Sequence, residues 1–369
     1  FTHKELQALI FGRSTKERRR GLLGRFALGF IVTHILSRKI DIEGDLLAKD
    51  RLLRVRYVLD RSGNKDDLRE RLEQLQDHIM IISDGVRQES ETIYTYHLDD
   101  SGREIAKATL ETSINNFMVP LVIAILASFS YDYQLPYLRE VDIKYDEEHH
   151  TYILDCIDKD IYNGFTRVSV KWLINRDVER RVEVMLCERN NNGKVGCALI
   201  KVDGAVISLL AKRTPKIWCP LPLVGRTEEI GVPIIIYGDF EPTPDRDTIM
   251  LNPESDEGRK NRRLLEGAIK CISHMIETAI TNNWTDAHKL AFIRYTDLPD
   301  ENERKFWNQY LIKIVKELFN KPIVRAYDGR FVKPSDPTLR FISPFIKIPE
   351  RGLSAHEDEL DRDVFMMFW

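Results

Sequence analysis

Three closely spaced glycines lie in the stretch Gly21-Leu-Leu-Gly-Arg-Phe-Ala-Leu-Gly-Phe30, which runs directly into the apolar segment Ile31-Val-Thr-His-Ile-Leu36. This order predicts a glycine-rich loop followed by a buried helix. Glycines let backbone N–H groups approach phosphate oxygens, and a helix N-terminus adds its dipole. The stretch is therefore a candidate phosphate site, whereas taken alone it is more typical of a turn before a core helix.

Side chains near this loop offer further contacts to a phosphate group. Ser14 and Thr15 supply hydroxyl donors, and Lys16 and Arg25 supply positive charge. A Walker loop requires G-x-x-x-x-G-K-[ST], and the sequence does not fit it because Arg25 follows the second glycine. A dinucleotide-binding fingerprint requires a preceding strand, whereas a basic loop at residues 12–20 precedes these glycines.

Composition places the chain among globular proteins. It has 369 residues, 43% hydrophobic and 31% charged, with a formal net charge of -3. The length predicts two or three domains, and the balanced charge gives no support for a globally basic nucleic-acid binder or an acidic disordered tail. The cysteines form no C-x-x-C pair, which argues against a disulfide framework or a zinc knuckle and favours the reducing cytoplasm. They are Cys156, Cys187, Cys197, Cys219 and Cys271.

Two further features concern the limits of the chain and membranes. The most apolar run, Met118 to Tyr131, is shorter than the roughly 20 residues of a spanning helix and contains Pro120. It is therefore interpreted as buried core, and no membrane association is expected. The chain opens at Phe1 in what reads as a helix, so we expect that a segment upstream is missing.

Hydrophobic periodicity predicts an α/β region, then a β-rich α/β region, then helices. Asn190-Asn-Asn-Gly193 is typical of a hairpin turn. Predicted strands are 51–59, 92–98, 168–173, 182–186, 196–202 and 232–237, and a hairpin is predicted at 324–332. Predicted helices are 1–11, 65–76, 104–115, 261–281 and 303–319, and the apolar run after residue 115 either extends its helix or packs beside it. Linkers near 131–136 and 251–259 give three predicted domains, 1–130, 131–255 and 256–369.

Three segments together resemble one protein family. Gly24-Arg-Phe-Ala-Leu-Gly-Phe30 resembles the second glycine box of the GHKL ATPases, which include the heat-shock chaperones and usually read G-[KQR]-F-G-[IVL]-G-F. Phe11-Gly-Arg-Ser-Thr-Lys16 is similar to the G-x-S-S-K lid segment of sacsin-like members. Much further on, Val232-Pro-Ile-Ile-Ile-Tyr-Gly-Asp-Phe-Glu-Pro-Thr-Pro-Asp-Arg-Asp-Thr-Ile249 resembles the sacsin-type stretch that ends in F-x-P-T-x-D-R.

The resemblance implies a Bergerat-type α/β sandwich, here only in part, followed by a β-rich α/β middle domain and a helical C-terminal region. ATP would lie under a mobile lid, and a middle-domain arginine, matched here by Arg246, would reach the γ-phosphate. A guanidinium suits that role because it carries permanent charge and forked donors. The alternative is local pairing of Arg246 with an aspartate: Asp239, Asp245 or Asp247. The ATP contacts implied by the resemblance are Ser14, Thr15, Lys16, Gly21, Gly24, Arg25, Phe26, Gly29 and Phe30.

The chain departs from the family pattern in two ways. Ala27 stands where the glycine box has its middle glycine. The family's base, its Mg²⁺-binding Asn and its D-x-G-x-G adenine box would lie upstream of Gly12, so this chain holds neither the Mg²⁺ ligand nor any other metal site that we predict. ATP binding by this chain alone is expected to be poor.

Other segments have simpler interpretations. His149-His150 follows three acidic residues, but neighbours on a strand face opposite ways, so we predict a loop and no shared metal. The basic residues from Lys16 to Arg20 are interpreted as a lid over phosphate, with nucleic-acid binding as the alternative. The cluster Arg259-Lys-Asn-Arg-Arg263 is expected to form a solvated helix face. Core or interface packing is expected for Trp172, Trp218, Trp284 and Trp307.

The resemblance implies an ATP-driven conformational switch with ATP hydrolysis and a chaperone-like action on a protein partner. In microbes, sacsin-like ATPases also occur in anti-phage defence. Two alternatives stay open: a scaffold without catalysis that binds a protein partner, and a nucleic-acid binder that uses the basic lid. Chaperone-type relatives dimerise, which makes a homodimer an option.

Overall fold

The computed structural model describes residues 2, 5–6, 33–48, 51–74, 79–84, 91–129, 138–162, 164–190, 193–210, 213–325 and 330–336. The fold is mixed α/β, with helix and strand in similar amounts. It divides into two compact units, Phe1–Thr112 and Ser113–Trp369, and the boundary lies within helix α4. The predicted helix at residues 1–11 and the glycine-rich loop fall almost wholly outside the described residues.

The first unit contains a four-stranded antiparallel sheet in the order β3-β2-β1-β4. One face is apolar because alternate residues of β1 and β2, such as Ile42 and Tyr57, point to the same side and are buried. On the other face Arg54 bonds to Glu43 and Asp45. The elements are η1 (Thr33–Ile35), β1 (Lys39–Ala48), β2 (Arg51–Asp60), α3 (Lys65–Gln74), β3 (Met80–Asp84) and β4 (Ile93–Tyr96).

A bent helix pair follows, α4 (Asp100–Asn115) and α5 (Met118–Phe129), with an angle of 68° between them. At the bend, Phe117 adopts a left-handed φ of 55° and its ring packs edge-on against Trp172 at 6.2 Å. The apolar run therefore forms a helix of its own. Within the described chain, no single helix has the length and apolarity to span a membrane, and this bent pair meets those criteria only when its two helices are counted together.

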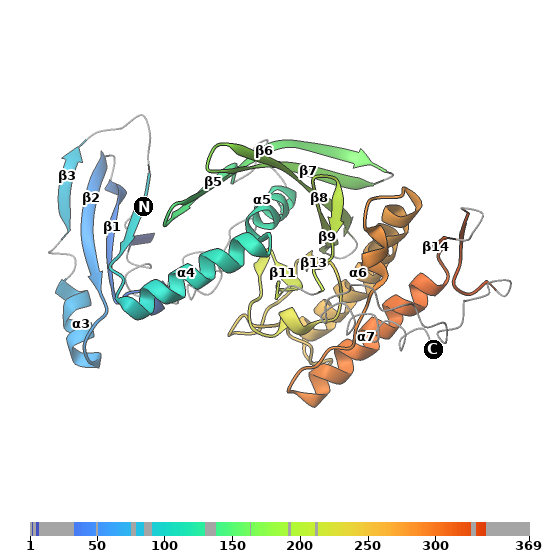
Figure 1. Cartoon of the computed structure of the whole chain (residues 1–369). Helices are drawn as coiled ribbons and strands as arrows, with labels where there is room; N and C mark the ends of the chain where they lie inside the picture. The colour runs from blue at the N-terminus through green and yellow to red at the C-terminus, as the bar shows by residue number, and fades with distance from the viewer. Residues whose placement is uncertain are drawn as a thin grey trace. The chain divides into compact units, whose positions relative to one another are not determined.

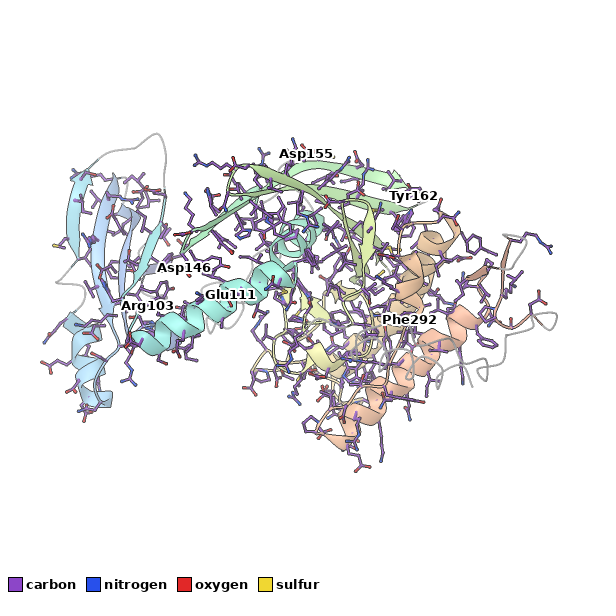
Figure 2. All side chains as sticks on the ribbon, viewed as in Figure 1. Arg103, Glu111, Asp146, Asp155, Tyr162 and Phe292 are labelled. Atoms are coloured by element: carbon purple, nitrogen blue, oxygen red, sulfur yellow. The ribbon has the colours of Figure 1, made fainter. Side chains whose placement is uncertain are left out.

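The second unit is built on a nine-stranded sheet in the order β12-β11-β13-β9-β8-β7-β6-β5, with β10 paired to β9 (Figure 1). Consecutive strands from β5 to β9 pair antiparallel, and the predicted Asn190–Gly193 turn joins β8 to β9, with Gly193 at φ 127°. Asp146, labelled in Figure 2, lies in the tight β5–β6 turn. The strands are β5 (Glu140–Tyr145), β6 (Glu148–Ile161), β7 (Phe165–Ile174), β8 (Val178–Asn190), β9 (Lys194–Val202), β10 (Ala205–Ile207), β11 (Ile217–Cys219), β12 (Leu221–Pro222) and β13 (Ile235–Gly238).

Helices cover both faces of this sheet. Met185 and Cys187 of β8 face α6, whereas Val184 and Leu186 alternate to the opposite side, where α5 packs (Figure 1). The sheet and the helices after residue 255 thus share one hydrophobic core. The three-domain division made from the sequence stays a prediction. The remaining elements are η3 (Thr227–Glu229), α6 (Asp256–Thr281), η4 (Ala287–Ala291), α7 (Glu301–Phe319), β14 (Val324–Arg325) and β15 (Phe331–Val332).

The core also places the tryptophans and cysteines. Trp218 and Trp307 are fully buried and Trp172 is 6% exposed, so the packing role predicted for them is confirmed. Trp284 is half-buried and packs against the same core. All five cysteines are free thiols.

Candidate functional site

The residue that the sequence favours most, Arg246, lies in a closed loop between β13 and α6. Pro242 and Ile249 form an antiparallel bridge across the loop. The Thr243 N–H donates to the Thr248 carbonyl at 3.0 Å, and the Arg246 N–H donates back to the Thr243 carbonyl at 2.9 Å. The backbone around Arg246 is therefore held as a tight turn.

Arg246 occupies a conformation that L-residues rarely adopt, with φ at 57°. Its side chain is half-buried, and its guanidinium makes no hydrogen bond or ion pair with any residue that the structure describes. None of the three aspartates suggested as local partners pairs with Arg246. Asp247 binds Arg226, Asp239 accepts a hydrogen bond from the Lys194 backbone, and no interaction joins the exposed Asp245 to Arg246.

The base of the loop is fixed by a buried amide on α6. The Asn261 side chain is fully buried and bonds to three backbone groups of the loop. Its Nδ2 donates to the carbonyls of Glu241 and Met250 at 2.8 and 2.9 Å, and its Oδ1 accepts from the Glu241 N–H at 2.8 Å. A buried amide that satisfies three backbone groups holds the two ends of the loop together.

The neighbouring cations on α6 confirm one part of a prediction from the sequence and correct another. Arg259 and Arg263 are exposed as expected, whereas Lys260 and Arg262 are only half-exposed and do not belong to a solvated face. The Lys260 ammonium pairs with Glu241 at 2.7 Å. Arg262 donates to the Leu251 carbonyl at 2.8 Å and lies over the Phe306 ring. These side chains brace the loop because their positive charges are close to its carbonyl and carboxylate oxygens.

A second arginine ties the far side of the loop to α7. Arg226 grips Asp247 with two parallel bonds, Nε to Oδ2 at 2.7 Å and Nη2 to Oδ1 at 3.1 Å. Its Nη1 reaches Glu303 at 2.8 Å, and the other Glu303 oxygen accepts from the Thr248 hydroxyl at 2.9 Å. Thr243 completes the group by donating to Asp247 at 2.9 Å. We refer to Arg226, Asp247 and Glu303 as the clasp.

The pKa values of the clasp follow from this geometry. Burial raises the pKa of Asp247, but hydrogen bonds from Arg226 and Thr243 outweigh it and bring the pKa below its ordinary value. The pKa of Arg226 is raised, chiefly by its hydrogen bond to Asp247. Arg226 and Asp247 are therefore a charged pair at neutral pH, with each partner stabilised by the other.

The other predicted site residues lie outside the described part of the chain. They form the glycine-rich loop and its basic neighbours, and their role stays a prediction. They are Ser14, Thr15, Lys16, Gly21, Gly24, Arg25, Phe26, Gly29 and Phe30.

The two adjacent histidines lie on strand β6, so the loop predicted for them is wrong. They have different partners, because His149 contacts Asp142 at 3.1 Å while His150 contacts Glu148 at 3.1 Å and accepts from the Trp172 indole N–H. Throughout the described ranges, no three His, Cys, Asp or Glu side chains gather in a way that could hold a metal ion.

Two buried lysines were not recognised from the sequence. Lys194, on β9, pairs with Glu188 at 3.1 Å, donates to the Ser128 carbonyl and lies over the Phe129 ring. Lys216 donates to two backbone carbonyls at 2.7 and 2.9 Å, and burial lowers its pKa to about 7. Both ammonium groups hold backbone segments together inside the second unit.

Comparison with known proteins adds no assignment. No protein-family model matches this chain, and no curated protein matches it either.

Proposed function

We propose that this chain is part of an ATP-driven conformational switch, in which Arg246 contacts the γ-phosphate of bound ATP. One observation carries the proposal: Arg246 is held at a braced turn while its own guanidinium bonds to none of the described residues. The resemblance of residues 11–30 and 232–249 to sacsin-like GHKL ATPases supports it.

The contrast with the other arginines of this region gives the observation its weight. Arg226 bonds to two carboxylates, Arg259 to Asp256 and to backbone carbonyls, and Arg262 to the Leu251 carbonyl. The guanidinium groups of these three arginines therefore bond to oxygen acceptors within the fold. Arg246 retains its forked donors for an acceptor that is not among the described residues.

Phosphate oxygens are the acceptors that such a fork fits best. In hydrolysis, water adds to the γ-phosphorus and ADP leaves, and negative charge spreads over the γ-phosphate oxygens. A guanidinium already placed at that position stabilises this charge without first rearranging.

The glycine-rich loop would supply the other phosphate contacts, and ATP would bring the lid and Arg246 onto one nucleotide. Hydrolysis would then release them. The family resemblance extends the proposal to the remodelling of a protein partner in the cytoplasm and, in microbes, to anti-phage defence.

Steady-state ATP turnover by the full-length protein tests the proposal. We compare the wild type with Arg246→Ala, Arg246→Lys and the control Arg69→Ala, which removes an exposed helical ion pair in the first unit. Arg246→Ala should bind ATP with an unchanged KM and lose about 10³-fold in kcat, and Arg246→Lys should recover only part of it. The Arg69 control should match the wild type.

The alternatives predict other results. A wild-type protein that binds no nucleotide would refute the switch and favour the scaffold. DNA or RNA binding that weakens steeply with salt, without ATP turnover, would favour the nucleic-acid binder.

A further inference from the structure

We propose that the clasp positions Arg246, so that Arg226, Asp247 and Glu303 are positioning residues for the contact with ATP. This inference rests on the proposed function, because it concerns how the Arg246 loop is presented. None of the three residues belongs to the segments whose resemblance suggested phosphate binding, except Asp247, which directly follows Arg246.

The clasp joins three parts of the chain that are distant in sequence. Arg226 precedes η3, Asp247 lies on the loop, and Glu303 belongs to the first turn of α7. The partners are separated by 21 and 77 residues. A bidentate Arg–carboxylate bond fixes orientation as well as distance. Asp247 is therefore held in both position and rotation, and the backbone of the adjacent Arg246 is held with it.

The Glu303 carboxylate bonds to the loop and to Arg226 instead of capping its own helix. Asp300 caps α7 by accepting from the Glu303 N–H at 2.7 Å, and a Glu three residues after a cap often bonds back to the N–H of the capping residue. Here one Glu303 oxygen accepts from Arg226 and the other from Thr248. Both acceptors serve the loop, while the helix cap keeps the Glu303 backbone in place.

The conformation of Arg246 explains why the loop needs such support. A left-handed φ at an L-residue is disfavoured and persists only where the surroundings determine it. The backbone bonds of the turn provide part of this constraint, and Thr243 and Thr248 link that turn directly to the two clasp carboxylates. Releasing the clasp should let the loop relax and move the guanidinium away from its working position.

Hydrogen exchange of the loop amides, read by mass spectrometry without nucleotide, tests the bracing by itself. The variants are Arg226→Ala, Asp247→Asn, Glu303→Gln and the control Arg69→Ala. Asp247→Asn should behave like Arg226→Ala, because the amide NH₂ faces a guanidinium donor and breaks the fork. Both should speed exchange at residues 242–250 about tenfold. Glu303→Gln should change it little, since a glutamine can still accept from Arg226 and donate to the Thr248 hydroxyl.

ATP kinetics of the same variants complete the test. Arg226→Ala and Asp247→Asn should lower kcat about tenfold or more and leave KM for ATP unchanged, and Glu303→Gln should retain most of the wild-type kcat. Unchanged exchange in both damaging variants, or equal losses in KM and kcat for all three, would overturn the positioning role. If exchange rises as expected but the wild-type protein binds no ATP, the proposed function fails while the bracing of the loop stands.

Discussion

Replacement of Arg246 by glycine separates the backbone of this residue from its side chain. At a φ of 57°, an L-residue carries a conformational penalty that glycine does not. Arg246→Ala removes the guanidinium and keeps this penalty, whereas Arg246→Gly removes both. The pair of variants therefore tests in one experiment both the left-handed turn and the absence of a partner for the guanidinium among the described residues.

The expected magnitudes follow from the contacts. Because the guanidinium has no partner among the described residues, Arg246→Ala should change the free energy of unfolding by no more than about 0.5 kcal/mol. Arg246→Gly should be about 1 kcal/mol more stable than Arg246→Ala, after allowing for the greater freedom of glycine in the unfolded chain. For a unit of this size, 1 kcal/mol corresponds to about 2–4 °C in Tm.

Thermal unfolding by circular dichroism, run beside ATP turnover, measures both effects. Both variants should be stable and both should be nearly inactive in hydrolysis. A destabilisation of Arg246→Ala by more than about 2 kcal/mol would refute the reasoning, because it would show that the guanidinium has a structural partner. Equal stability of the glycine and alanine variants would refute the left-handed turn.

Three further substitutions test the surroundings of the site and the core. Asn261→Ala should lower the free energy of unfolding by about 3 kcal/mol in urea titrations, since three buried backbone groups lose their partner; a loss below about 1 kcal/mol would contradict the anchoring role. Burial lowers the pKa of Lys216 to about 7, which is below its pKa in the unfolded chain. Between about pH 7 and 10 the unfolded chain therefore binds more protons at this residue than the folded chain, and the free energy of unfolding rises with pH. Subtracting the stability curve of Lys216→Met should reveal this slope of about 1.4 kcal/mol per pH unit, and parallel curves would argue against it. Gly196→Ala should cost about 3 kcal/mol in thermal unfolding, because a Cβ would lie 2.6 Å from the Cys187 carbonyl and 2.8 Å from the Tyr237 ring; a neutral effect would contradict this close packing.

The sequence predicted the central strands and the long helices well because their patterns are strong. The strands at 168–173, 182–186 and 196–202 are confirmed in β7, β8 and β9, where buried apolar residues and the Asn190–Gly193 turn act together. The helices at 261–281 and 303–319 are confirmed as the bodies of α6 and α7. The two helices begin earlier than predicted, at Asp256 and Glu301, because their first turns are acidic and carry no apolar period.

Strands with charged faces were missed. Strand β1 alternates Ile40 and Ile42 with Asp41 and Glu43, and its acidic residues face arginines of β2 that no local pattern reveals. The start of β6, where three acidic residues precede His149, was interpreted as a loop. In both strands, the pairing across the sheet with the strand next to it in the chain decides the structure, and the residue pattern of the strand itself does not show that pairing.

In the candidate site, too, some residues have a local sequence pattern and others depend on the tertiary fold. Arg246 could be found because its neighbours form a recognisable stretch. Asp247 was considered only as a partner of Arg246, whereas its actual partner, Arg226, lies 21 residues earlier. Glu303 had no signal beyond its place near a helix start. A local pattern suggested the proposed ligand contact, whereas the residues proposed to position it are brought together only by the tertiary fold.

Arg226 has a second consequence for Arg246, because it occupies the carboxylate of the next residue, Asp247. Both Asp247 oxygens accept hydrogen bonds from Arg226. In Arg226→Ala, this carboxylate is released beside Arg246 and can pair with it, which would be worth about 0.5–1 kcal/mol for a partly exposed pair. The double variant Arg226→Ala with Asp247→Ala removes that competitor and leaves the bracing no stronger than in Arg226→Ala.

The two effects of Arg226 therefore predict opposite results in the double variant. If capture by Asp247 contributes, the double variant should hydrolyse ATP about two- to fivefold faster than Arg226→Ala, which is the fold-change that 0.5–1 kcal/mol supplies. If bracing alone matters, the double variant should be as slow as Arg226→Ala or slower, because Thr243 also loses its acceptor. The proposed contact with ATP needs a fixed backbone at Arg246 and an Asp247 carboxylate that does not compete for its guanidinium. A rate above that of the single variant would show that Arg226 provides the second condition.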